Sequence, residues 1–252
     1  LVPASISIIL LAIRGSYYAF GTYGLKDNKF YTFLYGVTGL FIPASLSIVL
    51  AISEGGFVDM VNNQPVLLYK KLLISPFTWS IVLLSIVSVL YISANFLTYY
   101  ANEAGDEQAR DLLRKYALMW SGPTILSAVV IIFQLKYHNA EHFAKMLDLS
   151  WMLVVSFGFF LVSLHLLIQK RYFGWSFISL VLQYAFAFYA YGFSHYPYLL
   201  YPYLTIYDSF TNKTMAIALV IAFIVGLFLL IPSLYLLMKL FLFNKKYVKG
   251  QM

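Results

Sequence analysis

Long apolar stretches alternate with short charged segments along the whole chain. Seven stretches of about 20 residues are nearly free of Asp, Glu, Lys and Arg, which is the length of a helix that crosses the apolar core of a bilayer. Because backbone amides in lipid must bond within their own segment, each stretch is expected to be an α-helix. The expected helices lie near 1–20, 31–53, 76–100, 113–136, 149–169, 173–193 and 215–240.

This pattern predicts an all-α polytopic transmembrane helical bundle, with residues 1–252 forming a single integral membrane domain. Local residues mark several helix ends. Ser75 and Pro76 open the third span, because proline is favoured at the first position of a helix, and Gly55-Gly56 follows the second span. Asn212 is expected in the N-cap region of the last span. The cytoplasmic segment 101–115 is expected to be a helical extension leading into the fourth span.

Basic residues indicate the orientation of the chain. If the loops alternate between the two sides of the membrane, 12 of the 17 Lys and Arg residues fall on one side and five on the other. Cytoplasmic loops are enriched in Lys and Arg, so the richer side, which includes the C-terminus, is expected to be cytoplasmic. The same rule explains the net charge of +7 without nucleic acid as a partner.

The composition excludes several kinds of chemistry. The chain has no Cys, so it cannot hold a disulfide, an iron–sulfur cluster or a cysteine-bound zinc ion. The middle thirds of the spans contain no Asp, Glu or Lys, which argues against a self-contained pump or antiporter. The last span has no Lys before Lys239, near its cytoplasmic end, which excludes a retinal-binding photoreceptor.

The four histidines are weighed individually. His165 is the only one within a span, and without a second intramembrane His it is interpreted as a packing or interface residue rather than a haem ligand. His138, Glu141 and His142 match the H-x-x-E-H form of certain zinc proteases, but no third ligand is nearby in the sequence. The segment is interpreted as a solvated loop at the start of a helix, and His195 as a loop contact. No catalytic, cofactor-binding or metal-ligating residue is assigned.

Arg14 is the one charge that borders an apolar core, because thirteen uncharged residues precede it. Two interpretations stay open. The guanidinium reaches the headgroup level as a snorkelling side chain, or it is a helix-end cation in a polar pathway or subunit contact.

A series of short segments follows one order along the chain. They are Leu10-Leu-Ala-Ile-Arg14-Gly15, Gly39-Leu-Phe-Ile-Pro43, Ser75-Pro76-Phe77, Ala94-Asn-Phe-Leu-Thr98 with Arg110, Leu113 and Arg114, and Tyr196-Pro197-Tyr198 with Tyr207-Asp208-Ser209. In this order and spacing the chain resembles the subunit II family of cytochrome bd quinol oxidases over essentially all 252 residues. Each segment is weak alone, and their shared order carries the resemblance.

The resemblance implies a chain truncated at its N-terminus, with two helices missing upstream and nine in the full subunit. It also implies a heterodimer with a larger subunit I that carries haem b, haem d and the quinol site, in a bacterial cell membrane. This chain would hold no haem. A structural quinone or lipid in this chain and a small accessory subunit beside it are further candidates.

One departure from the family concerns the residues after Arg14. Many members carry an acid five residues on and a second Arg seven on, where this chain has Ala19 and Gly21. If relatives use this region as a proton route, the route is absent or rebuilt here. Arg14 and Asp208 are therefore kept only as candidates for a polar pathway or a subunit contact.

The function expected from these features is that of a haem-free subunit II of a bd-type terminal oxidase. It would stabilise subunit I, while the complex oxidises quinol and reduces dioxygen to water. The alternative is a small multi-pass membrane transporter or permease, and a scaffold in an unrelated membrane assembly shares the same composition. An oxidase subunit should bring haem absorbance only together with its larger partner, whereas a transporter should be stable and colourless alone.

Overall fold

The computed structural model describes residues 2–23, 29–61, 64–208 and 212–242. Most of these residues are helical, as the apolar pattern predicts. The helices are α1 (Val2–Tyr23), α2 (Lys29–Ser53), α3 (Tyr69–Ile74), α4 (Pro76–Ala104), α5 (Glu107–His138), α6 (Ala140–Asp148), α7 (Ser150–Ile168), α8 (Phe173–His195) and α9 (Lys213–Leu237), with a π-helical turn, Met238–Leu242, after α9. The short strands are β1 (Val58–Val61), β2 (Gln64–Leu67), β3 (Tyr198–Leu200) and β4 (Leu204–Thr205).

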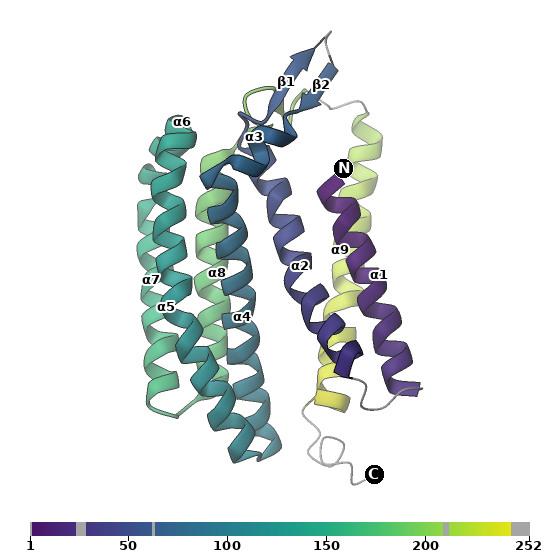
Figure 1. Ribbon diagram of the computed structural model, residues 1–252, viewed down its shortest axis with the longest axis vertical. Coiled ribbons are helices and arrows are strands. Elements are labelled where there is room, and N and C mark those ends of the chain that lie inside the picture. The colour runs from purple at the N-terminus through teal and green to yellow at the C-terminus, as the bar shows by residue number, and fades with distance from the viewer. Residues whose placement is uncertain (1, 24–28, 62–63, 209–211, 243–252) are drawn as a thin grey trace.

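Each of the seven expected spans falls on one of the long helices, so the prediction of an all-α bundle is confirmed. Among the described residues, six helices are long and apolar enough to cross a membrane: α2, α4, α5, α7, α8 and α9. In α1 the apolar stretch Val2–Tyr17 is shorter than these six. The helices run roughly side by side along the long axis of the molecule (Figure 1).

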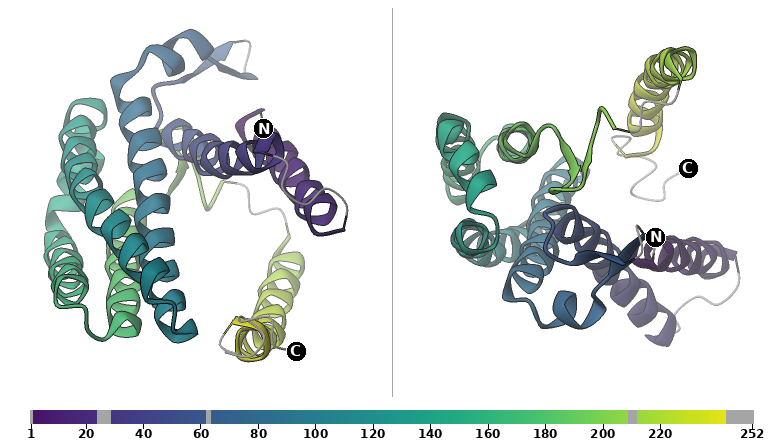
Figure 2. Two further views of the ribbon diagram at one scale, coloured as in Figure 1. Left: turned by 60° about the horizontal axis from the view of Figure 1, so that its bottom comes forward. Right: turned by 90° about the horizontal axis from the view of Figure 1, so that it is seen from above.

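The long helices form one compact group and a looser set beside it. Helices α4, α5, α7 and α8 pack together in the compact group, and α2 joins it through its contact with α4 (Figure 2). Helix α1 packs on α2. Helix α9 stands apart from the compact group in these views, and none of its residues is buried (Figure 2).

Polar side chains contribute to the compact group. Asn95 of α4 is fully buried, and its amide nitrogen donates hydrogen bonds of 3.2 Å each to the hydroxyls of Ser163 in α7 and Ser176 in α8. Bonds of this kind hold helices together in lipid, where an unpaired polar group is costly. Asn95 therefore connects three helices within the compact group.

The described parts of the two long connections between spans carry secondary structure. In the first, β1 and β2 form an antiparallel hairpin with Val58 paired to Leu67, and the short helix α3 follows it. In the second, β3 and β4 form another antiparallel pair. Together with α6, these elements lie at one end of the molecule, called the α6 end here, at the top of Figure 1.

Most of the local signals at helix ends are confirmed. Pro76 is at the start of α4 with Ser75 as N-cap, and the Asn212 side chain accepts hydrogen bonds from the backbone N–H of Thr214 and Met215 at the start of α9. The segment 101–115 is helical apart from a break at residues 105–106. There Gly105 ends α4 with φ +77°, and the Asp106 side chain caps α5.

Candidate functional site

Glu54 is a buried carboxylate at the point where α2 ends. Gly55 and Gly56 follow it with φ of +83° and +75°, a left-handed conformation that turns the chain out of the helix at low cost only for glycine. The backbone N–H of Tyr201 donates to the Ser53 carbonyl, and a Cβ on Gly55 would lie 2.1 Å from the Tyr201 carbonyl oxygen. The close approach of the second hairpin therefore requires glycine here and covers Glu54.

Four polar side chains surround the Glu54 carboxylate. The His142 Nδ1 lies 2.9 Å from Oε2, and the Asn139 amide nitrogen lies 3.4 Å from the same oxygen. The Tyr191 hydroxyl donates to Oε1, and the His195 Nδ1 lies 3.6 Å from Oε1. We call this set, Glu54, Asn139, His142, Tyr191 and His195, the α6-end cluster. It joins the end of α2 to α6 and α8.

Two opposing effects set the charge state of Glu54. Burial by itself raises the pKa of the carboxyl, because water no longer solvates the anion. The hydrogen bond and charge of His142 lower the pKa, and the Tyr191 hydrogen bond and the His195 charge add to this. The net pKa lies below the ordinary value, so Glu54 is an anion at neutral pH.

The position of His142 follows from the cap of α6. Asn139 lies between α5 and α6, and its side-chain oxygen accepts the backbone N–H of His142 at 3.1 Å, as an N-cap residue does. This cap places the His142 ring against the end of α8, where Nε2 lies 2.7 Å from the Ser194 hydroxyl. The imidazole is thereby held between Glu54 and Ser194.

The H-x-x-E-H motif does not assemble as a unit. His138 stacks on Phe77, with ring centroids 4.2 Å apart, and its Nε2 lies 3.1 Å from the Gly55 carbonyl oxygen. Glu141 is exposed and accepts hydrogen bonds from Lys145 and Tyr201. The interpretation of this segment as a solvated loop is wrong for His142, because α6 packs on α8 and buries that imidazole.

The other two histidines were interpreted as contacts, and the structure shows what each one contacts. His195 ends α8, and its ring lies parallel to that of Tyr191, with centroids 5.8 Å apart. His165 lies near the far end of α7 from the α6 end, where its Nε2 is 2.8 Å from the Gln169 side-chain nitrogen. Sequence reasoning assigned no role to Glu54, although an acid between an apolar span and two glycines was a visible signal.

Arg14 connects α1 to α2. Its Nη1 donates a 2.8 Å hydrogen bond to the Tyr35 carbonyl oxygen, and the guanidinium lies 3.8 Å above the centre of the Tyr35 ring. A Cβ on Gly39 would lie 2.2 Å from Nη1, so the glycine makes room for the cation. This is a contact between two helices of one chain. Ala19 and Gly21, where the family pattern differs, lie in the part of α1 whose side chains are not described.

Asp208 stabilises a turn. Its carboxylate accepts hydrogen bonds of 2.7 Å from both the backbone N–H and the hydroxyl of Thr205. These bonds lower the pKa of the Asp208 carboxyl. The side chain is exposed and stays next to β4, so the structure does not bring it together with Arg14.

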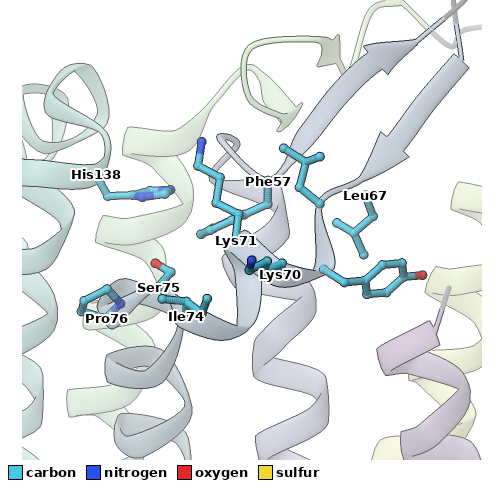
Figure 3. Close-up of a pocket in the computed structure, with 10 residues that line it drawn as sticks. Phe57, Leu67, Lys70, Lys71, Ile74, Ser75, Pro76 and His138 are labelled. Atoms are coloured by element: carbon cyan, nitrogen blue, oxygen red, sulfur yellow. The ribbon is translucent and has the colours of Figure 1, made fainter.

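A cavity of about 770 Å³ adjoins the α6-end cluster between the first hairpin, α3 and His138 (Figure 3). Its lining is mostly apolar and includes Phe57, Leu67 and Ile74, together with Lys70 and Lys71. An apolar space with two ammonium groups beside it suits an amphiphile with an anionic head.

Comparisons with known proteins agree with one another. Residues 1–241 match the family described as cytochrome bd terminal oxidase subunit II. A protein of Bacillus subtilis (strain 168), provisionally named cytochrome bd menaquinol oxidase subunit II, is 30% identical over 259 residues, covering 100% of this chain and 75% of that protein. A chain in the structure of bd oxidase from Geobacillus thermodenitrificans is 70% identical with a TM-score of 0.83, covering 97% of this chain and 74% of that one.

These matches extend over nearly the whole chain and include both the sequence and the arrangement of the helices. The resemblance inferred from short ordered segments is therefore confirmed. The chain belongs to the cytochrome bd terminal oxidase subunit II family and is a multi-pass membrane component of a bd quinol oxidase complex.

Proposed function

We propose that this chain is a haem-free subunit whose role is to stabilise a larger, haem-bearing subunit I. The complex would oxidise quinol and reduce dioxygen to water. The B. subtilis relative is named for menaquinol, and the similarity makes menaquinol the quinol proposed here. The haem iron of the partner would supply the oxygen chemistry, and this chain would supply packing and exclusion of water.

The observation that carries this proposal is the placement of the four histidines. His138, His142 and His195 all lie at the α6 end, where their rings contact aromatic residues or Glu54. His165 lies far from them, near the other end of α7. No two imidazoles in this chain therefore face each other across a gap of the kind that a bis-histidine haem fills.

The outer surface of the bundle supports a role in assembly. Helix α9 is strongly apolar over 25 residues, yet none of them is buried by the described part of the chain. In a membrane such a face contacts lipid or another protein. We propose that part of this apolar surface packs on subunit I.

The orientation is proposed from the distribution of basic residues. The side with 12 of the 17 Lys and Arg residues, including the C-terminus, would face the cytoplasm of a bacterial cell. The α6 end, with its hairpins, would then face outward. Arg14 would act within this chain as a contact between helices, and Asp208 as a turn residue, with no part in catalysis.

Expression of subunit I with and without full-length subunit II tests the stabilising role. We expect subunit I to lose haem and oxidase activity in membranes that lack subunit II, and to regain both when the two are expressed together. The haem-to-protein ratio of purified subunit I is the measurement. A subunit I that keeps its full haem content and stability alone would overturn the proposal, and solute transport by subunit II alone in vesicles would favour a transporter.

A further inference from the structure

We propose that Glu54, His142 and His195 form a binding site for a divalent metal ion of the zinc class. The three side chains come from the end of α2, from α6 and from the end of α8. Their ligand atoms all lie within 4.8 Å of one another. The proposal concerns side chains of this chain alone, so it stands or falls independently of the proposed function.

The hydrogen bonds of Ser194 bear on the tautomer of His142. The Ser194 hydroxyl has a single hydrogen, which can go to the backbone carbonyl oxygen of Ala190 at 2.8 Å, to that of Tyr191 at 2.9 Å, or to Nε2 of His142 at 2.7 Å. When a carbonyl takes the hydrogen, the Ser194 oxygen accepts the Nε2–H of His142. The neutral ring then has a lone pair on Nδ1, next to Glu54.

In that tautomer Nδ1 and the carboxylate are both acceptors. Nδ1 lies 2.9 Å from Oε2 of Glu54, and two acceptors at this separation repel each other in a buried site. A positive charge between them removes the repulsion, and a proton or a metal ion can fill this position.

His195 favours the metal ion over the proton. Its Nδ1 lies 3.6 Å from Oε1 of Glu54, which is longer than a hydrogen bond. Ligands about 2.0–2.1 Å from a tetrahedral zinc ion lie roughly 3.3 Å from one another. A proton on His142 satisfies only the pair with Glu54, whereas a metal ion uses His195 as well. The other ring nitrogen of His195, Nε2, is buried and has no hydrogen-bond partner among the described residues.

The chemistry of the donors and of their neighbours fits zinc. Two imidazoles and one carboxylate form the ligand set of many zinc enzymes, and the side chains are 3%, 11% and 0% exposed for His142, His195 and Glu54. Metal-bound histidines commonly donate the second ring N–H to a neighbouring acceptor, and the Ser194 oxygen, 2.7 Å from Nε2, can be that acceptor for His142. Asn139 and Tyr191 donate to the carboxylate and hold it in place.

The test uses the intact oxidase complex with full-length subunit II. The complex is dialysed against a zinc-containing buffer and then against zinc-free buffer. Zinc and iron are then measured together by mass spectrometry, and the amount of haem iron gives the amount of complex. We expect one zinc ion per complex in the wild type. The zinc-edge X-ray absorption spectrum should show nitrogen and oxygen ligands at about 2.0–2.1 Å, including imidazoles, and no sulfur shell.

Variants locate the ion. His142→Gln and His195→Gln should lose the zinc, Ser194→Ala should weaken zinc binding by roughly 10- to 100-fold, and His165→Gln serves as the matched control that keeps it. A wild-type complex without zinc, or zinc retained equally by the His142 and His195 variants, would overturn the proposal. If these variants do not assemble, a wild-type absorption spectrum without imidazole ligands would overturn it as well.

Discussion

Glu54 shows what a single buried charge requires. Removing a carboxylate from water costs several kcal/mol, so it remains charged only when it is paired and hydrogen-bonded. Here one oxygen accepts from Tyr191, and the other lies within hydrogen-bond distance of His142 and Asn139. Such a pair is strongly destabilised when one member is lost, because the other stays buried without compensation.

Glu54→Ala should therefore lower the free energy of unfolding of the complex by about 3–5 kcal/mol, with a loss of thermal stability as the readout. Glu141→Ala is the matched control. Glu141 is exposed and pairs with Lys145 on the surface of α6, so its loss should cost less than about 1 kcal/mol. Equal losses of stability in the two variants would show that the carboxylate of Glu54 is not buried and paired as described.

Asp208 should behave as a turn residue rather than as part of a proton route. Asp208→Ala should leave oxidase turnover unchanged and accelerate hydrogen exchange at the Thr205 amide, because the carboxylate accepts that N–H. The pKa of the Asp208 carboxyl is lowered from 3.8 in the folded protein. The contribution of the carboxylate to the stability of the turn is therefore complete above pH 3.8, and it is lost as the pH falls through the lower pKa of the folded state. A large loss of turnover in Asp208→Ala would contradict this assignment.

The α6-end cluster could not be predicted from the sequence. Glu54 and His142 are 88 residues apart, and no local pattern connects them. The four-residue spacing of His138 and His142 suggested one shared site, but the chain changes direction at Asn139, so the two rings enter different surroundings. Burial by distant segments, rather than the sequence around each residue, decides the role of both histidines.

At the scale of elements, signals that act within one turn of chain were reliable. Proline at the start of α4, glycine after α2 and Asn212 before α9 each satisfy backbone groups or backbone angles locally, so residue type alone indicates them. Helices α3 and α6 and the two hairpins were not foreseen. They are too short to be stable alone, and they form because they pack on one end of the bundle.

The contact between α1 and α2 should depend on the absence of a side chain at Gly39. Gly39→Ala should displace the Arg14 guanidinium and cost about 1 kcal/mol relative to Gly36→Ala, which meets open space in the same helix. Both changes gain similar helix propensity, so their difference reports the displaced contact. In an Arg14→Ala background the difference should vanish, and a difference that persists would contradict the contact.

The start of α9 should depend on its cap. Asn212→Ala removes the acceptor for the backbone N–H groups of Thr214 and Met215, and should cost about 1 kcal/mol of helix stability. Hydrogen exchange in the first turn of α9 should increase accordingly. Asn212→Asp keeps an acceptor at this position and should restore the protection, whereas equally fast exchange in both variants would contradict the role of the cap.

At the scale of the whole molecule, the number and position of the long helices could be predicted because bilayer thickness sets their length. The way they pack could not. Apolar composition is the same whether a helix faces lipid, its own bundle or another subunit, so the separate position of α9 left no mark in the sequence. The same ambiguity is the reason that the partner was inferred from a family resemblance rather than from hydropathy.

The most direct test of the central claim is the location of the haem. Reduced-minus-oxidised absorbance spectra are recorded for the intact oxidase and for full-length subunit II separated from it under mild conditions. All haem absorbance should belong to fractions that contain subunit I, and separated subunit II should be colourless. A separated subunit II that retains stoichiometric haem would contradict the account.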